Sequence, residues 1–269
     1  MINHHYHGAN FFLTITADPN WPEIEEALLP GQTSADRPDL AVRVFHKKVE
    51  ELKADIFKCG YLSKTVARVW TIKFQKRGLP HIHMIIFVDS ENKLRTLEDI
   101  NTLLSAEFPD EDEEPELFEL VKKHMVHTPC GPSSSKAPCM KDGKCSKGFP
   151  KPFRDETVIN KDSYANLRRC NTGKTYQVRG HQVDNRWVVP YPHFWLWKFR
   201  CHINMECILS IKAIKYIYKY VYKGHDCTTM EFGQCQDEIK LYLDSCYVSA
   251  CEGLWRLYQF SMHESPNVV

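Results

Sequence analysis

The spacing of apolar residues divides the first part of the chain into short elements. Residues 11–16 are β-branched and aromatic and end at a cluster of turn-forming residues, which predicts a strand that leaves into a loop. Apolar residues recur at helical spacing over 40–58, which predicts a helix. Residues 66–74 and 81–88 have the composition of two strands, and 75–80 contain the residues of a hairpin turn between them.

The later part of the chain mixes helical and irregular patterns. Helical spacing predicts further helices over 91–107, 115–126, 210–223 and 241–258. Residues 127–153 hold several prolines and glycines and too little periodicity for regular structure, so something else must order them. Because strands and helices alternate without a regular βαβ rhythm, we predict an α+β fold.

Length and composition are those of an ordinary soluble globular protein. With 269 residues, 43% of them hydrophobic, the chain is one large domain or two small ones and can bury a substantial core. No apolar run approaches the length of a membrane span, and the N-terminus lacks the apolar stretch of a signal peptide. We therefore expect no membrane partner and a location in the cytoplasm or nucleus.

Charge is unevenly distributed although the net charge is only +1. Residues 107–119 hold eight acidic and no basic residues, 140–154 hold five basic residues and one acid, and 212–223 hold four lysines and no acid. Local basic segments contact phosphates even when the whole chain is neutral. The alternative for each run taken alone is a solvated surface.

A pair of histidines, His81 and His83, lies on the second predicted hairpin strand. Alternate residues of a strand face the same side, so the two imidazoles project together and offer two ligands to a divalent cation. If the hairpin pairs Gln75 with His81, the carboxamide oxygen becomes a third ligand, and Lys73 then lies opposite His83. Open positions suit a Lewis acid rather than a structural ion. The alternative is a chance His-x-His pattern on an amphipathic strand.

A tyrosine- and lysine-rich helix is predicted near residue 220. Tyr216 and Tyr220 share one helical face, and each has a lysine three residues further on, Lys219 and Lys223. A nearby ammonium stabilises the charge that develops when a phenol attacks a phosphodiester. A second pair occupies another face, Tyr218 and Tyr222. Spacing alone decides neither between the pairs nor against an amphipathic helix with aromatic core contacts.

Eleven cysteines are many for a chain without a secretory signal, in which metal binding is a better explanation than disulfides. His127, Cys130, Cys139 and Cys145 lie in a stretch rich in glycine, proline and serine. A Cys3His set is a structural zinc pattern, and zinc would order a segment that has few apolar residues. Free thiols are the alternative.

Three of these motifs resemble strings of the replication-initiator domain of Helitron transposon proteins, which belongs to the HUH (His-hydrophobe-His) nucleases. Residues 74–83 are similar to its Gln-x-Arg-Gly-x-Pro-His-x-His string, and 215–224 to its Lys-Tyr-x-x-Lys-Tyr-x-x-Lys-Gly string. Residues 127–147 contain its His-x-Pro-Cys-Gly and Pro-Cys-Met-x-x-Gly-x-Cys-x-Lys strings. Further similar strings extend the resemblance over nearly the whole chain, at 12–22, 28–39, 184–191, 202–204 and 237–256.

The resemblance implies an HUH-nuclease-like antiparallel sheet flanked by helices, with residues 127–153 inserted as a zinc-binding segment between the nuclease parts 1–126 and 154–269. It implies an endonuclease of the rolling-circle replication initiator and transposase type, acting in the nucleus on single-stranded DNA at transposon ends. Its Mg2+ or Mn2+ ligands would be His81, His83 and Gln75. Its nucleophiles would be Tyr216 and Tyr220, which form a 5′-phosphotyrosine intermediate with Lys219 and Lys223 beside them. The expected DNA contacts are Thr14, Thr16, Arg77, Lys147, Lys151 and Lys215.

Departures from the family pattern keep other functions open. Lys73 stands where an acidic residue is expected, Cys246 replaces an arginine, and the helicase that the family normally carries lies outside this sequence. One alternative is a catalytically inactive, transposon-derived DNA-binding module, and a weaker one is a zinc-ordered protein-interaction domain. Nucleotide binding at Gly173-Lys174-Thr175 is rejected, because Arg168 occupies the position where the phosphate-binding loop needs its first glycine.

Overall fold

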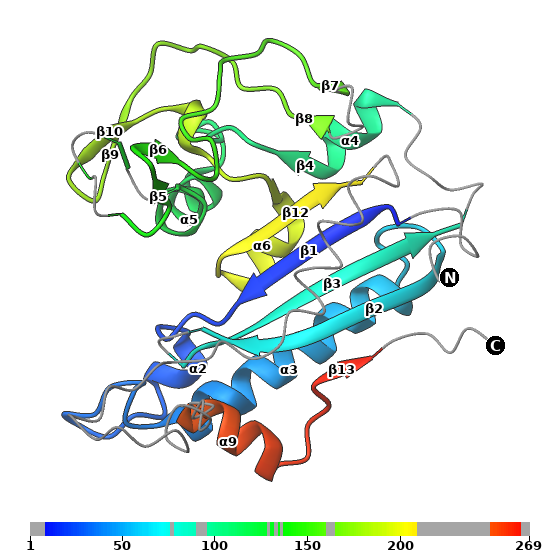
Figure 1. Cartoon of the computed structure of the whole chain (residues 1–269), viewed down its shortest axis with the longest axis vertical. Coiled ribbons are helices and arrows are strands. Elements are labelled where there is room, and N and C mark those ends of the chain that lie inside the picture. The colour runs from blue at the N-terminus through cyan, green and yellow to red at the C-terminus, as the bar shows by residue number, and fades with distance from the viewer. Residues whose placement is uncertain are drawn as a thin grey trace, which may run out of the picture.

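A computed structural model describes residues 9–75, 78–89, 96–127, 130–131, 134, 137–159, 165–208 and 248–264 (Figure 1). Its central feature is a five-stranded antiparallel sheet with the strand order β12-β1-β3-β2-β13. The strands are β1 (Phe11–Thr16), β2 (Thr65–Phe74), β3 (Pro80–Val88), β12 (Ile203–Cys207) and β13 (His263–Glu264). The predicted strands at 11–16, 66–74 and 81–88 are confirmed, as is the α+β class.

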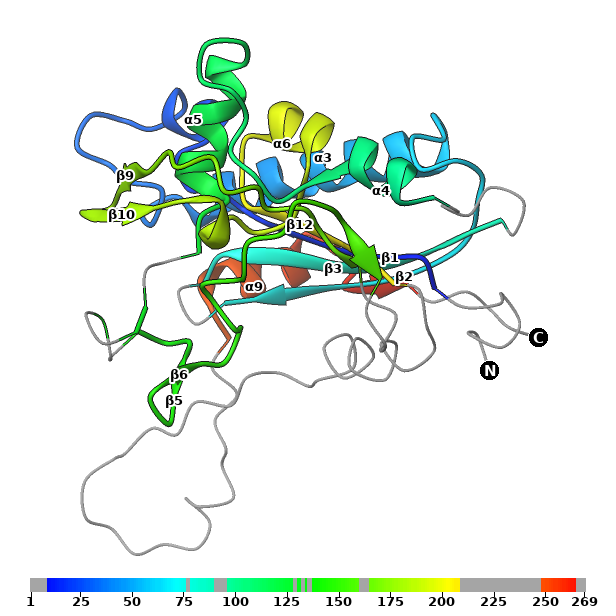
Figure 2. The ribbon, with the colours of Figure 1, turned by 90° about the horizontal axis from the view of Figure 1, so that it is seen from above.

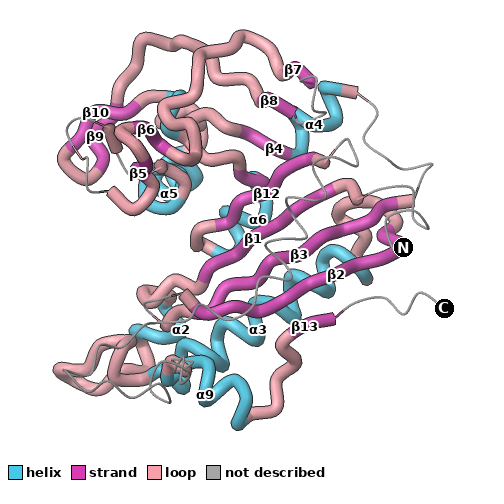
Figure 3. The backbone as a smooth tube through the Cα atoms, in the orientation of Figure 1, coloured by secondary structure: helices cyan, strands magenta, loops and turns pink. Residues whose placement is uncertain are grey.

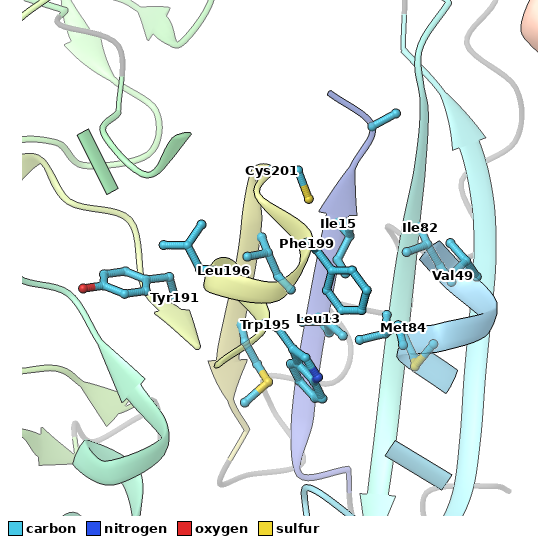
Figure 4. Packing of buried hydrophobic residues seen from close by; sticks show 14 of the residues in the cluster. Leu13, Ile15, Val49, Ile82, Met84, Tyr191, Trp195, Leu196, Phe199 and Cys201 are labelled. Atoms are coloured by element: carbon cyan, nitrogen blue, oxygen red, sulfur yellow. The ribbon is translucent and has the colours of Figure 1, made fainter. Parts of the chain in front are cut away.

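Helices cover one face of this sheet, as Figure 2 shows for α3 and α6. These helices are α3 (Pro38–Phe57) and α6 (His193–Phe199). Further helices pack on them: α2 (Pro22–Glu25) and α9 (Ala250–Leu257) on α3, and α5 (Pro115–His124) on α6. The face of the sheet toward the helices is apolar because strand side chains alternate. Leu13 of β1 and Met84 of β3 are fully buried there, together with Val49 of α3 and Trp195 of α6 (Figure 4).

The chain beyond the β12 edge consists mostly of loops with short paired strands (Figure 3). Its elements are α4 (Leu97–Leu103), β4 (Leu104–Ser105), β5 (Met140–Lys141), β6 (Lys144–Cys145), β7 (Val158–Ile159), β8 (Ala165–Asn166), β9 (Tyr176–Val178), β10 (His181–Val183), the 3-10 helix η2 (Asn185–Trp187) and β11 (Tyr191–Pro192). No helix in the described ranges is long and apolar enough to span a membrane.

One helix prediction needs correction, and two others are described in part or not at all. The helix expected over 91–107 is wrong in its second half: α4 ends at Leu103 because the next residues extend to form β4, which pairs with β11. Of the helix expected over 241–258, residues 241–247 lie outside the described residues. The described part is α9, which begins at Ala250, where the Ser249 hydroxyl accepts a hydrogen bond from the Glu252 amide and caps the first turn. The helix predicted at 210–223 lies outside the described residues.

Candidate functional site

The sheet face opposite α3 is polar near the β2–β3 turn, where the histidine pair lies, and apolar further along, where Val69 and Ile85 are buried. Strand register aligns Thr14 of β1, His83 of β3 and Thr71 of β2 in one row across the sheet. The next row aligns Thr16, His81 and Lys73. Directly opposed residues of antiparallel strands place their side chains on the same face. The two predicted ligands on β3 therefore share one face, as the alternation of the sequence predicted, and the β1 threonines lie on the same face.

The predicted hairpin register is wrong by two residues. Lys73, not Gln75, pairs with His81. The turn is tighter than expected: the Gln75 amide donates to the Leu79 carbonyl at 3.0 Å, and the Gly78 amide donates to the Gln75 carbonyl at 2.7 Å. Gly78 has a φ of +87°, a conformation that glycine adopts without strain. Gln75 is consequently an exposed residue just beyond the end of β2.

Contacts around His83 fix its ring. A hydrogen bond of 3.0 Å joins the Thr14 hydroxyl to His83 Nδ1. The ring stacks on Phe12, with 5.5 Å between centroids, and meets His81 edge-on at 4.8 Å. Burial, helped by the positive charges of His81 and Lys73, lowers the pKa of His83 to about 3. The imidazole is therefore neutral at neutral pH, and its Nδ1 is engaged by Thr14.

Lys73 brings a positive charge into this site. It is half-buried and lies opposite His81 in the sheet. Its ammonium lowers the pKa of His83, so its charge reaches the histidine pair. A positive charge this close to the histidine pair repels a divalent cation bound there and attracts a phosphate. Lys73 therefore lies opposite His81, and not opposite His83 as the predicted hairpin pairing placed it.

The second predicted ligand set is brought together. The ligand atoms of His127, Cys130, Cys139 and Cys145 all lie within 4.8 Å of one another. His127 Nε2 is 3.7 Å from Cys130 Sγ and 3.6 Å from Cys145 Sγ. A tetrahedral zinc with its usual bond lengths requires nitrogen–sulfur and sulfur–sulfur separations of about 3.5–3.8 Å. The donor set therefore has the chemistry of a structural zinc site, and both separations from His127 Nε2 fit this spacing.

Local structure explains how a segment without periodicity assembles this cluster. The β5–β6 hairpin aligns Met140 with Cys145, and the Ser146 amide donates to the Cys139 carbonyl at 2.7 Å, which holds two of the cysteines together. His127 is held from the other side: its amide donates to the Trp187 carbonyl at 2.8 Å, and its ring stacks on Phe149 at 4.3 Å.

The cysteine thiols respond differently to this environment. Burial, together with hydrogen bonds with the neighbouring thiols Cys145 and Cys139, raises the pKa of Cys130 to about 12. Burial also raises the pKa of Cys145, but hydrogen bonds from the backbone amides of Phe149 and Lys147 outweigh it and leave a net lowering. A bound cation would stabilise the thiolates and so supply the charge that Cys130 needs to ionise.

Several predicted residues cannot be placed. Six lie outside the described residues: Tyr216, Tyr220, Lys219, Lys223, Lys215 and Arg77. Lys147 and Lys151 are described and lie directly after Cys145, where the Lys151 ammonium donates to the Lys147 carbonyl at 2.8 Å. Their role as DNA contacts stays a prediction, and so does that of Thr14 and Thr16.

Sequence reasoning missed the polar residues of β12. Asn204 pairs with Thr14 in the register, so it lies in the same row as His83. Asn204 and Glu206 also line a cavity of about 750 Å³ between β12 and the Cys/His segment. The alternation of polar and apolar residues over 202–207 is the pattern of a half-buried strand and could have revealed them.

Comparison with known proteins connects this geometry to a class of proteins. Residues 1–86 match the family model described as the Helitron helicase-like domain at the N-terminus. The matched segment contains β1, α3, β2 and the part of β3 that holds His81 and His83. It is therefore similar to a domain of transposon proteins, and the match indicates a transposon-related function. No curated protein matches the chain.

Proposed function

We propose that the chain is an HUH-type endonuclease and strand transferase that nicks and rejoins single-stranded DNA. The observation that carries this proposal is the position of His81 and His83: both lie on the polar face of a central antiparallel strand, within the segment that matches the Helitron family. The substrate would be the single-stranded ends of a transposon, which implies action in the nucleus.

The histidine pair has the donor chemistry of an open metal site. Its two nitrogens, with Gln75 as a third candidate ligand, leave positions for oxygen atoms of the substrate. A divalent cation bound there supplies positive charge that polarises the scissile phosphate. Thr14 would hold the His83 ring so that Nε2 points to that position, because a metal-binding imidazole donates its other N–H to a fixed acceptor.

The nucleophile would come from the tyrosine pair at Tyr216 and Tyr220, which lies outside the described residues. The phenolic oxygen attacks phosphorus, a bond from tyrosine to the 5′-phosphate forms, and the bond from phosphorus to the 3′-oxygen breaks. The phenol loses its proton to water, and the leaving 3′-oxygen takes a proton from water. A 3′-hydroxyl that attacks the phosphotyrosine reverses these steps and rejoins the strands. The lysines Lys219 and Lys223 would stabilise the phenolate.

A second function, binding DNA without cutting it, is favoured by one observation. Lys73 lies opposite His81, where its ammonium opposes a divalent cation and attracts a phosphate. A module that had exchanged catalysis for binding would have this charge distribution. The two functions differ in one measurable property, which is metal-dependent cleavage.

The test is a nicking assay on labelled single-stranded DNA with added Mn2+ or Mg2+. Mn2+ should be tried first, because Mg2+ prefers all-oxygen ligand sets. The wild-type protein should cut, and the double variant His81→Ala/His83→Ala should lose at least about a thousandfold in rate, equivalent to roughly 4 kcal/mol of transition-state stabilisation. His181→Ala is the matched control, because it removes a histidine from β10, on the far side of the β12 edge from β3 (Figure 1).

The outcomes separate the two functions. Cutting by the wild type and by His181→Ala, but not by the double variant, supports the endonuclease. Salt-sensitive DNA binding without cutting in any metal supports the inactive module. Cutting by the double variant at the wild-type rate would refute the metal assignment.

A further inference from the structure

The cavity of about 750 Å³ beside β12, here called the β12 pocket, borders the Cys/His cluster at His127, and its lining does not include His81 or His83. Strand β12 forms one wall with Asn204 and Glu206. The chain that follows the zinc-binding residues forms the opposite wall with Lys147, Lys151 and Arg154. Its volume lies within the range of about 300–1,000 Å³ that is typical of small-ligand sites.

Electrostatics favour an anion in the β12 pocket. Its lining carries four basic side chains and one carboxylate: Lys147, Lys151, Arg154, Arg169 and Glu206. Arg169 is a buried residue of this lining, and its Nη1 donates to three backbone carbonyls, at 2.6, 2.7 and 3.1 Å. Those bonds fix the guanidinium in place, so its charge adds to the potential of the pocket without moving toward solvent.

The basic wall is held in position. Besides its bond to the Lys147 carbonyl, the Lys151 ammonium lies 5.1 Å from the centre of the Phe149 ring. Gly148 has a φ of +66°, a backbone conformation that glycine adopts without strain, so this turn favours glycine. A cationic wall beside an aromatic ring is the combination with which proteins bind single-stranded nucleic acids.

The opposite wall carries hydrogen-bonding groups that suit a base. The Asn204 amide donates to Glu206 Oε1 at 3.4 Å, which orients the carboxylate. A carboxylate has about four acceptor positions, so this long bond leaves Glu206 able to accept from a ligand. Carboxylates read the amino group of cytosine, and adenine and guanine offer amino donors as well, whereas thymine has none.

The pocket lies close to the proposed cleavage site. Asn204 pairs with Thr14, and Thr14 pairs with His83, so the wall of the pocket lies two strand spacings, about 10 Å, from the histidine pair. Figure 2 shows the β5–β6 hairpin on the side of the sheet away from α3 and α6, which is the side of the polar face. One DNA strand can therefore reach both places.

We propose that the β12 pocket binds one unpaired nucleotide next to the cleaved phosphate, with its phosphate on the Lys147–Lys151 wall and an amino-bearing base at Glu206. This inference rests on the proposed function and deepens it by naming a specificity site. It makes the zinc-binding segment one wall of a DNA site, because Lys147 is only two residues from Cys145. A base in a duplex cannot enter, since its amino group is already paired.

Binding of fluorescent decamers by the full chain, without added divalent cation, tests the proposal. The wild type should bind dC10 more tightly than dT10 by roughly threefold to tenfold, the range of one hydrogen bond. Glu206→Gln should reduce this preference while leaving dT10 affinity equal or higher. Lys151→Glu should weaken binding of both oligonucleotides by at least about tenfold, and the milder Lys151→Gln should lower the slope of log K against log salt by about 0.7.

Lys141→Glu is the matched control, because Lys141 is an exposed lysine of the same segment that does not line the pocket. Zinc content and circular dichroism should be checked for every variant. Equal losses in Lys141→Glu and Lys151→Glu would overturn the pocket in favour of diffuse attraction. Equal binding of dC10 and dT10 by the wild type would overturn base reading.

Failure of this inference and failure of the proposed function are distinguishable. The His81→Ala/His83→Ala variant should bind dC10 as the wild type does, because it keeps the pocket. Selective binding of dC10 by a protein that never cuts would support the pocket and refute the endonuclease. Cutting that is unaffected in Lys151→Glu, with unchanged dC10 affinity, would refute the pocket alone.

Discussion

The two ligand clusters of this protein are built in opposite ways. His81 and His83 lie on a central strand of regular structure. The register of the sheet places Thr14 and Thr71 on either side of His83. The Cys/His cluster lies in a segment of loops and one two-residue hairpin, where few apolar side chains are buried. The packed sheet fixes the positions of the two histidines, whereas the Cys/His cluster must itself stabilise the segment in which it lies.

This difference predicts different dependences on metal. A ligand pair on a packed strand persists when its cation is removed, because the core on the other face supplies the stability. A Cys3His set in a poorly packed loop contributes its metal-binding energy directly to folding. Open sites are typical of catalytic metals, and closed sites of structural ones.

The largest effect on stability should follow loss of zinc. Cys139→Ser removes one of four ligands and should abolish stoichiometric zinc binding. It should also destabilise the Cys/His segment by more than about 4 kcal/mol, since loss of a metal is among the few causes of such large changes. Elemental analysis and thermal unfolding measure both results. Cys59→Ser, at an exposed cysteine outside the cluster, is the control. A protein purified without chelator that contains no zinc, or a Cys139→Ser variant of unchanged stability, would contradict the comparison.

Lys73→Glu should change the cation site of the sheet without changing the fold. The substitution replaces a charge that opposes a cation by one that attracts it, opposite His81. The Coulomb energy of one unit charge near 4 Å is about 1–4 kcal/mol, depending on the effective dielectric constant. Divalent binding measured by calorimetry should therefore tighten by at least about fivefold, and nicking should rise.

Lys73→Gln, which only removes the charge, should give a smaller gain. Unchanged metal affinity in both variants would mean that the side chain is directed away from the histidine pair.

The smallest expected effect comes from a histidine that belongs to neither cluster. Burial lowers the pKa of His124 to about 4, although Asp18, at 3.7 Å, acts in the opposite direction. The unfolded chain, with a histidine pKa of about 6.5, binds more protons than the folded one between these values. Protonation of His124 therefore favours the unfolded state. Its effect on the free energy of unfolding is absent above pH 6.5, and this free energy falls as the pH drops toward 4.

His124→Gln should flatten that dependence by about 1–3 kcal/mol in denaturant titrations at pH 5 against pH 7.5. This separates the effect of protons on the fold from their effect on the zinc ligands. An equally steep loss in the variant would assign the pH dependence to other groups.

Sequence reasoning succeeded where the information was local. The alternation of residues placed both histidines on one face, and helical spacing located α3. Each pattern depends only on which residues of one element face the core. It failed for the hairpin register, because the register is set by the tight turn at Gly78. As a result Gln75 lies outside the paired residues of β2 and β3. Sequence reasoning also missed β12, because five residues pair with a strand nearly two hundred positions away in the chain, and nothing local specifies that partner.

The four residues that could hold zinc were found for a different reason. His127 and the three cysteines lie close together in the sequence, so residue type and spacing sufficed without knowledge of the fold. The β12 pocket could not be predicted in this way, since its walls come from segments separated by about fifty residues and meet only in the folded chain. A cluster of ligands that are close in the sequence could therefore be predicted from it, whereas a cavity between distant segments could not.

Formation of a covalent protein–DNA adduct tests the central claim most directly. The wild-type protein, incubated with labelled single-stranded DNA and Mn2+, should form a phosphotyrosine adduct that peptide mass spectrometry assigns to Tyr216 or Tyr220. Tyr216→Phe/Tyr220→Phe should form none, because phenylalanine keeps the ring and removes only the attacking oxygen, whereas Tyr218→Phe/Tyr222→Phe should react normally. An adduct that persists in the first double variant and disappears in the second would contradict the choice of nucleophile. The absence of any adduct from a wild-type protein that still binds the DNA would contradict the endonuclease itself.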